Sequence, residues 1–207
     1  MSVDIPYMRR SIDAAFRLAL RDEGAWSVFD LTAEGFFRSF AAIFAVIPLN
    51  IVIDILRTHL AIGKLLAEGK TVTGGYDLSD AVFSTATLFA EWLIFPVAMI
   101  FVLRFLGLAR RYSALIIAHN WGTVVVALLN IPAYALYAIG LVGVDQALDL
   151  TFIVLGLTLY YRFYIAQTAL DAGWNVALSI TCLSFVLQIY FLAGVEFTAG
   201  LWLASGS

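Results

Sequence analysis

Five long apolar runs fill most of the chain, and only short polar segments separate them. An apolar run of about 20 residues crosses the hydrocarbon layer of a bilayer, about 30 Å thick, as one helix. A soluble chain of 207 residues could not hide so many runs of this length. In lipid a spanning segment must satisfy its own backbone hydrogen bonds, which a helix does. The pattern therefore predicts an all-α integral membrane protein.

Composition agrees with this class and excludes others. The mean hydropathy is +0.93, and Asp, Glu, Lys and Arg together make up 13% of the residues. The formal net charge is −3 and no basic block is present, so no nucleic-acid partner is expected. The sole cysteine, Cys182, lies in an apolar run, where it predicts neither an intrachain disulfide nor a thiolate metal site.

Two regions follow from the pattern of the chain. Residues 1–29 are expected to form an amphipathic cytoplasmic arm, and residues 30–207 a five-helix transmembrane bundle. The expected spans are residues 32–57, 79–108, 112–139, 148–170 and 175–203. The first three each contain a proline, and Pro48 is expected to kink the first of them.

The N-terminal arm has the pattern of an interfacial helix. Its apolar residues recur at steps of three and four, namely Ile5, Met8, Ile12, Phe16 and Ala19. Its arginines lie elsewhere on the helical wheel, namely Arg9, Arg10, Arg17 and Arg21. Such a helix either lies on an anionic lipid surface, with these arginines binding the lipid, or packs on the protein's own helices. The sequence leaves both interpretations open.

The distribution of Lys and Arg predicts the orientation. With the N-terminus inside, the inner flanks hold Arg9, Arg10, Arg17, Arg21, Arg38, Arg104, Arg110, Arg111 and Arg162. The outer flanks hold only Arg57, Lys64 and Lys70. Because Lys and Arg are retained in cytoplasmic loops, the N-terminus is expected in the cytoplasm and the C-terminus outside.

Polar side chains recur at helical spacing inside the apolar runs. They are Asn50, Asp54 and Arg57; Ser84, Thr87 and Glu91; Asn120, Thr123, Asn130 and Tyr134, with His119 adjacent; Thr158 and Arg162; and Thr181, Ser184 and Gln188. Ionisable groups in hydrocarbon usually face protein or water, so each helix is expected to turn one polar face inward.

These faces define two candidate clusters. The inner polar cluster consists of Glu91, His119, Asn120 and Arg162, in which Glu91 could contact either Arg162 or His119. The outer polar cluster consists of Asn50, Asp54, Arg57 and Glu196, in which Arg57 could pair with either acid. The inner polar cluster is either structural, fixing the register of the helices, or part of a proton- or ion-linked path. A carboxylate and a histidine on different helices do not distinguish the two.

Several reaction classes lack their motifs. The chain has no Walker A loop, no Gly-rich dinucleotide fingerprint, no H-E-x-x-H helix and no G-x-S-x-G elbow. Its two histidines, His59 and His119, cannot form a multi-histidine metal or haem site. No cofactor, metal or enzymatic activity is therefore expected.

Three patches of sequence resemble known membrane families. Ala118 to Trp121 (AHNW), Tyr161 to Ala166 (YRFYIA) and Phe29 to Phe37 (FDLTAEGFF) resemble segments of a bacterial inner-membrane family without an assigned activity. The layout of five short-looped spans after an amphipathic arm is similar to that of Yip1-type membrane proteins. The resemblance implies a bacterial inner-membrane protein with a non-enzymatic role in organising lipids or partner proteins.

Two functions fit these observations. The first is a non-catalytic scaffold or accessory subunit that binds membrane lipids and other membrane proteins, or associates with itself. The second is a small transporter or channel subunit with an ion- or proton-linked path past Glu91, His119 and Arg162. A water-filled cavity that reaches Glu91 would favour the second, and a dry, fully paired Glu91 would disfavour it.

Overall fold

The computed structural model describes the backbone of residues 5–205 and the side chains as far as Val195. Glu196 of the outer polar cluster lies outside the described side chains. The described part of the chain contains helices and no strand. The α-helices are α1 (Ile5–Ala19), α2 (Ala33–Ser39), α3 (Ala42–Ala67), α4 (Leu78–Phe105), α5 (Tyr112–Ala138), α6 (Val144–Leu170) and α7 (Trp174–Ser205). Two short 3₁₀ helices, η1 (Glu23–Ser27) and η2 (Ala109–Arg111), join them.

Five helical segments have the length and hydropathy of membrane spans, as the sequence predicts. They are Ala33–Ala67, Leu78–Phe105, Ala109–Ala138, Val144–Leu170 and Trp174–Val195. The first begins with the separate helix α2 and continues to Ala67, well beyond the expected end at residue 57. The fourth begins at Val144 rather than 148, because the Gln146 side chain accepts a hydrogen bond of 2.8 Å from the N–H of Gly143.

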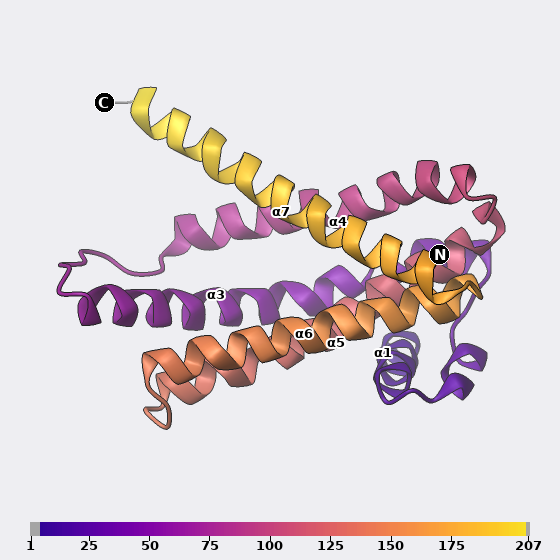
Figure 1. The fold of residues 1–207 in the computed structure, drawn as a ribbon, viewed down its shortest axis with the longest axis horizontal. Helices are drawn as coiled ribbons and strands as arrows, with labels where there is room; N and C mark the ends of the chain where they lie inside the picture. Colours follow the sequence, from indigo (N-terminus) through magenta and orange to yellow (C-terminus); the bar gives the residue numbers. More distant parts are fainter. Residues whose placement is uncertain (1–4, 206–207) are drawn as a thin grey trace.

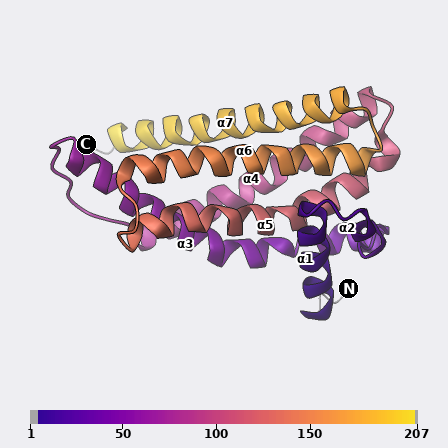
Figure 2. The ribbon, with the colours of Figure 1, turned by 60° about the horizontal axis from the view of Figure 1, so that its bottom comes forward.

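Helix α5 is the centre of the bundle. It packs against α3, α6, α1 and α2, and its middle part is buried on several sides. Figures 1 and 2 show α4 and α7 farther from this centre, with α7 diverging from α6 towards its C-terminal end in Figure 1. Gly122 lets α5 approach α6, because a Cβ there would lie only 2.8 Å from Ile165 Cδ1. The outer faces of α4 and α7 are left apolar and exposed.

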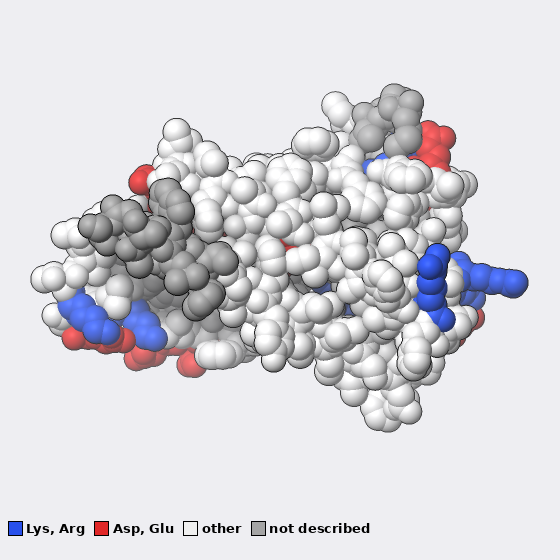
Figure 3. Space-filling view, turned by 90° about the horizontal axis from the view of Figure 1, so that it is seen from above, with Lys and Arg blue, Asp and Glu red and all other residues white. Residues whose placement is uncertain are grey.

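Helix α1 and the C-terminal end of α7 lie at opposite ends of the bundle (Figures 1 and 2). Helices α1 and α2 and the α6–α7 link form one end, which we call the α1 end. The α3–α4 and α5–α6 loops and the C-terminal part of α7 form the other, the α3–α4 end. Figure 3 shows Lys, Arg, Asp and Glu gathered at these two ends, with a largely uncharged belt between them. This distribution is typical of helices that cross a bilayer.

Helix α1 lies across the α1 end and packs on the bundle (Figure 2). Its buried residues are Tyr7, Ser11, Ala14, Ala15 and Leu18. The Tyr161 hydroxyl donates a 2.8 Å hydrogen bond to the carbonyl of Ala15. The α1 helix therefore packs on the protein's own helices.

The apolar stripe expected from the sequence is only partly covered by the bundle, because Met8, Ile12 and Ala19 pack partly buried against the core. Ile5 and Phe16 of that stripe are 82% and 40% exposed. Residues one or two positions apart point in different directions on a helix, so the buried face of α1 covers one edge of the apolar stripe and leaves the other edge exposed. Contact of the exposed edge with lipid stays a prediction.

Candidate functional site

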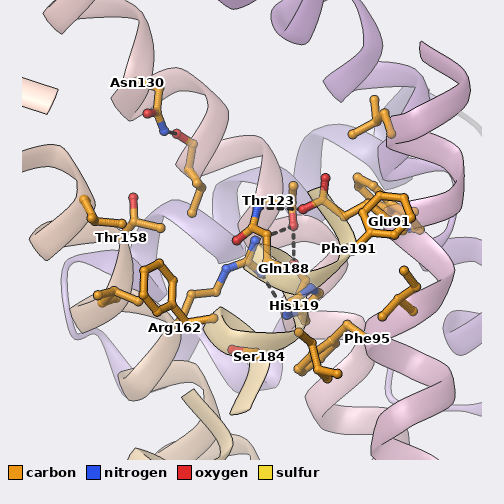
Figure 4. Close-up of a pocket in the computed structure, with 18 of the residues that line it drawn as sticks. Glu91, Phe95, His119, Thr123, Asn130, Thr158, Arg162, Ser184, Gln188 and Phe191 are labelled. Atoms are coloured by element: carbon orange, nitrogen blue, oxygen red, sulfur yellow. Dashed lines mark hydrogen bonds between the residues drawn. The ribbon is translucent and has the colours of Figure 1, made fainter. Parts of the chain in front are cut away.

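A cavity of about 410 Å³ lies between α4, α5, α6 and α7. Figure 4 shows side chains from these four helices converging on it. Its polar lining consists of Glu91, Trp92, His119, Thr123, Asn130, Tyr134, Thr151, Thr158, Arg162, Ser184 and Gln188. Most of these residues belong to the polar faces that the sequence places inside the bundle. The inward orientation of those faces on α5, α6 and α7 is thus confirmed.

Arg162 of α6 is held by three neutral acceptors on α5. One guanidinium nitrogen lies 2.8 Å from Nδ1 of His119 and 3.2 Å from its carbonyl oxygen. The other donates to the hydroxyl of Thr123 at 2.9 Å. That hydroxyl donates in turn to the His119 carbonyl, also at 2.9 Å. The His119–Thr123 turn therefore fixes the guanidinium at the cavity wall.

The contact with Arg162 defines the protonation state of His119. A guanidinium has donors only, so Nδ1 of His119 must carry the lone pair and the ring proton must sit on Nε2. The ring also stacks on Phe95, with the ring centroids 3.8 Å apart and the planes at 12°. In this arrangement His119 is a neutral residue that positions Arg162. A relay that protonates Nδ1 would have to break this contact.

Glu91 of α4 contacts neither of its expected partners. Its carboxylate accepts a 2.6 Å hydrogen bond from the Gln188 amide of α7. In the described part of the chain, neither Arg162 nor His119 forms an ion pair with it within 4.0 Å. The expected Glu91–Arg162 or Glu91–His119 contact is therefore not formed, because Gln188 is the residue that reaches Glu91. A cation and an anion thus line one cavity without touching.

Two further polar groups at the cavity are buried and have no hydrogen-bond partner among the described residues. They are the hydroxyl of Thr158 on α6 and the indole Nε1–H of Trp92 on α4. A buried polar atom without a partner costs about 1–3 kcal/mol. Both groups thus lie beside the cavity with a hydrogen-bond donor that no described residue uses.

Asn120, the remaining member of the inner polar cluster, does not face the cavity. It is 1% exposed, and its amide donates a 2.9 Å hydrogen bond to the hydroxyl of Ser39 at the end of α2. Residues 119 and 120 differ by about 100° around a helix, so they point to different neighbours. The structure brings together Glu91, His119 and Arg162, and places Asn120 in the contact between α5 and α2.

The outer polar cluster forms between α3 and α4. Asp54 is 4% exposed and accepts hydrogen bonds from the Asn50 amide at 2.9 Å, from the Arg57 guanidinium at 2.7 Å, and from the Ser84 hydroxyl. Arg57 thus pairs with Asp54, one of its two expected partners. Ser84 joins this cluster although the sequence groups it with Glu91. All three partners donate, so both carboxylate oxygens of Asp54 are hydrogen-bonded within the fold.

The four arginines of the arm have different surroundings. Arg17 forms an ion pair with Asp22 at 2.7 Å, and the Arg21 guanidinium lies 5.1 Å from the centre of the Tyr164 ring. Arg9 and Arg10 are exposed and form no ion pair with the described residues. Only these two are free to meet a lipid surface without losing a contact inside the protein.

Two titratable groups outside the spans have shifted pKa values. Burial raises the pKa of the Tyr7 hydroxyl, which faces the Gly35 carbonyl at 3.4 Å, so the group stays neutral. The pKa of Asp77 is lowered, first by the hydrogen bond from the Ser79 hydroxyl and then by the backbone N–H of Asp80. Asp77 therefore remains an ionised N-cap of α4, where negative charge is favourable.

No metal centre is apparent in the part of the chain that the structure describes, where no three His, Cys, Asp or Glu side chains lie together. The cavity instead offers one guanidinium, one carboxylate and several neutral hydrogen-bonding groups. Sequence reasoning missed Trp92 and Phe95, because an aromatic residue in an apolar run carries no sign of its partner. Ser39 was missed for a similar reason, since its partner lies far away in the sequence.

Comparison with known proteins assigns no family. No family model, no curated protein and no solved structure matches the chain. The resemblance to Yip1-type proteins stays a prediction.

Proposed function

We propose that this chain is a multi-pass membrane protein that works as a small transporter or channel subunit, with its path through the cavity. One observation carries the proposal: Glu91 and Arg162 line the same space of about 410 Å³ in the middle of the bundle without forming an ion pair. A charged side chain within the bilayer is costly and is usually kept for an ion or substrate path. A purely structural pair would be expected to close on itself.

The orientation and compartment belong to the same proposal. The α1 end, with its excess of arginine, faces the cytoplasm of a bacterial inner membrane, and the α3–α4 end faces outward. Five helices enclose only a narrow path, so conduction through the whole membrane would use a second copy or a partner subunit. The proposal involves no catalytic step.

The proposal predicts that the cavity is wet. In a variant with Cys182 replaced by Ala, a new cysteine at Ser184, which lines the cavity, should react with a water-soluble, charged methanethiosulfonate in detergent-free nanodiscs. The reason is that the reagent attacks the thiolate, which forms in water and not in hydrocarbon. We expect labelling at least about tenfold faster than at Leu157, which lies on the exposed side of α6. Mass spectrometry of the intact protein measures both rates.

A second variant controls for access. Cysteine at Val125, which is 2% exposed in the core of α5, should label no faster than Leu157→Cys. If Ser184→Cys labels as slowly as these two, the cavity is dry and the transport proposal is wrong. If it labels rapidly, proton flux into reconstituted vesicles should then fall in Glu91→Gln and stay unchanged in Glu68→Gln, which alters an exposed loop carboxylate.

The scaffold hypothesis is supported by a different observation, on α1. Exposed apolar Ile5, Phe16 and Leu20 lie beside Arg9 and Arg10, which have no ion-pair partner among the described residues. A helix with this arrangement binds the anionic interface of a bilayer. This function would hold lipids or neighbouring proteins at the α1 end, and it is compatible with transport through the cavity.

We expect Arg9→Glu with Arg10→Glu to loosen α1 from anionic lipid, because each basic residue near such a surface contributes about 1 kcal/mol. A fluorophore on cysteine at position 5 reports the change through quenching by aqueous iodide. The unaltered arm should be shielded more in anionic than in neutral nanodiscs, and the double variant should lose this difference. Lys64→Glu with Lys70→Glu, at the α3–α4 end, should keep it. Equal shielding of the unaltered arm in both lipids would contradict lipid binding.

A further inference from the structure

The charges of the cavity predict what it binds. Arg162 donates to a histidine nitrogen, a carbonyl and a hydroxyl, and Glu91 accepts from an amide. All of these partners are neutral, so each charge is oriented but not neutralised by direct contact. In Figure 4 the Glu91 carboxylate and the Arg162 guanidinium both point towards the middle of the cavity. A ligand with one negative and one positive group would satisfy both charges at once.

The mouth of the cavity has a different chemistry from its interior. Phe152 and Leu155 of α6 line the cavity and are also 69% and 38% exposed. The cavity therefore reaches the surface of the bundle between apolar side chains. On a membrane span, an exposed apolar surface faces acyl chains. A ligand that enters here has a polar part for the interior and an apolar part for the mouth.

The unpartnered groups favour an anion near Arg162. The Thr158 hydroxyl lies on α6 one turn before Arg162, and it is buried without a partner among the described residues. The indole N–H of Trp92 follows Glu91 on α4 and is also unpartnered there. Both can donate to phosphate or carboxylate oxygens, which accept several hydrogen bonds each. The cavity thus holds more donors than its own acceptors use.

We propose that the ligand of this cavity is a membrane amphiphile with a zwitterionic head group, namely a primary ammonium beside a phosphate or carboxylate. Arg162 and Thr158 bind the anionic group, Glu91 and Gln188 bind the ammonium, and the apolar tail leaves past Phe152 and Leu155. A cavity of about 410 Å³ suits a head group rather than a whole lipid. This inference rests on the proposed function and names its substrate class.

Two other ligand classes fit the cavity less well. A purely anionic head group would gain from Arg162 but would be repelled by Glu91 in the same space. A water-soluble zwitterion would satisfy both charges but would make no apolar contact with Phe152 and Leu155 at the mouth. Each class is an outcome that the following experiment can detect.

Native mass spectrometry of the full chain, released from detergent, tests the inference. The probes are dioleoylphosphatidylethanolamine, dioleoylphosphatidylglycerol, dioleoylglycerol and free phosphoethanolamine, each at the same concentration. We expect phosphatidylethanolamine to be retained at least about tenfold more than phosphatidylglycerol, because its ammonium adds a charge-assisted hydrogen bond, and more again than diacylglycerol, which carries neither charged group. Free phosphoethanolamine at the same concentration should not displace the lipid.

Substitutions of Arg162 and Glu91 test separately which ligand group each charge binds. Arg162→Gln should lower retention of phosphatidylethanolamine about tenfold, and Arg162→Lys should retain an intermediate amount because it keeps the charge without the planar fork. Glu91→Gln should abolish the preference over phosphatidylglycerol, since the repulsion of an anionic head is removed. Arg110→Gln, which removes an exposed charge in η2, should change nothing. Gel filtration of each variant confirms that the fold is intact.

Three outcomes would overturn the inference. They are equal retention of phosphatidylglycerol by the unaltered protein, full retention of phosphatidylethanolamine by Arg162→Gln, and displacement by free phosphoethanolamine, which would identify a soluble ligand. These failures differ from failure of the proposed function. If Ser184→Cys labels rapidly while no lipid is preferred, the proposal of a water-filled path is supported and only the proposed substrate class is wrong.

Discussion

Replacing Trp121 by Ala should lower the free energy of unfolding by about 3–5 kcal/mol, the cost of removing a large aromatic side chain from a packed core. Trp121 is 0% exposed and lies on α5 where α1 docks. Its ring meets that of Tyr7 edge to face, with the centroids 5.7 Å apart. Removing it therefore leaves a cavity and also takes away the surface on which α1 rests. Thermal or denaturant unfolding in a fixed detergent measures the loss.

The same variant has a second, local readout. Trypsin cleaves after arginine, and α1 carries Arg9, Arg10 and Arg17. Loss of the Trp121 side chain should expose this helix, so we expect faster cleavage in the arm than in the unaltered protein. Trp174→Ala is the matched control, because Trp174 is 62% exposed at the start of α7. If Trp121→Ala unfolds and is cleaved like that control, α1 does not depend on this contact.

The five long helices could be predicted from the sequence because their signals are local to each helix. Apolar length and the periodicity of polar residues depend on one helix at a time, and both are visible in the chain. For this reason the five long helices and the inward faces carrying Thr123, Thr158 and Gln188 agree with expectation. The Arg57–Asp54 ion pair could also be predicted from the sequence, since both residues lie within one turn of the same helix.

What the sequence could not provide is the rotation of one helix against another. Gln188 rather than Arg162 reaches Glu91, and Asn120 turns to Ser39 instead of the cavity. Ser84 lies on the same face of α4 as Glu91 but joins Asp54, because α4 borders α3 in one half and the cavity in the other. Periodicity predicts on which face of its helix a residue lies, but it does not predict which other helix packs against that face. In lipid no hydrophobic force separates the alternatives, so small residues and packing decide.

The α1 helix is a second case in which the sequence pattern does not predict which face packs against the protein. Its apolar stripe with Ile5 and Phe16 is the stronger sequence pattern, yet the buried face carries Tyr7, Ser11 and Ala14. A helix that touches both protein and lipid has two apolar faces, and hydropathy alone does not say which one the protein covers.

Asp54→Asn should lower the free energy of unfolding by about 1–3 kcal/mol, the cost of leaving a buried hydrogen-bonding group unsatisfied. The carboxylate of Asp54 accepts from Asn50, Arg57 and Ser84, and all three donate. An asparagine at this position has one oxygen and one NH₂ group, so a donor would face a donor on one side. The substitution keeps the volume, and the loss therefore reports hydrogen bonding and charge rather than packing.

Matched variants separate these contributions. Asp149→Asn changes an exposed acid on α6 and should leave stability unchanged. Ser84→Ala should cost less than Asp54→Asn, because it removes one donor and leaves the carboxylate with two. Unfolding in the same detergent ranks the three variants. An Asp54→Asn protein as stable as the Asp149→Asn protein would show that the amide satisfies its neighbours. The stability of the cluster between α3 and α4 would then not depend on the negative charge of Asp54.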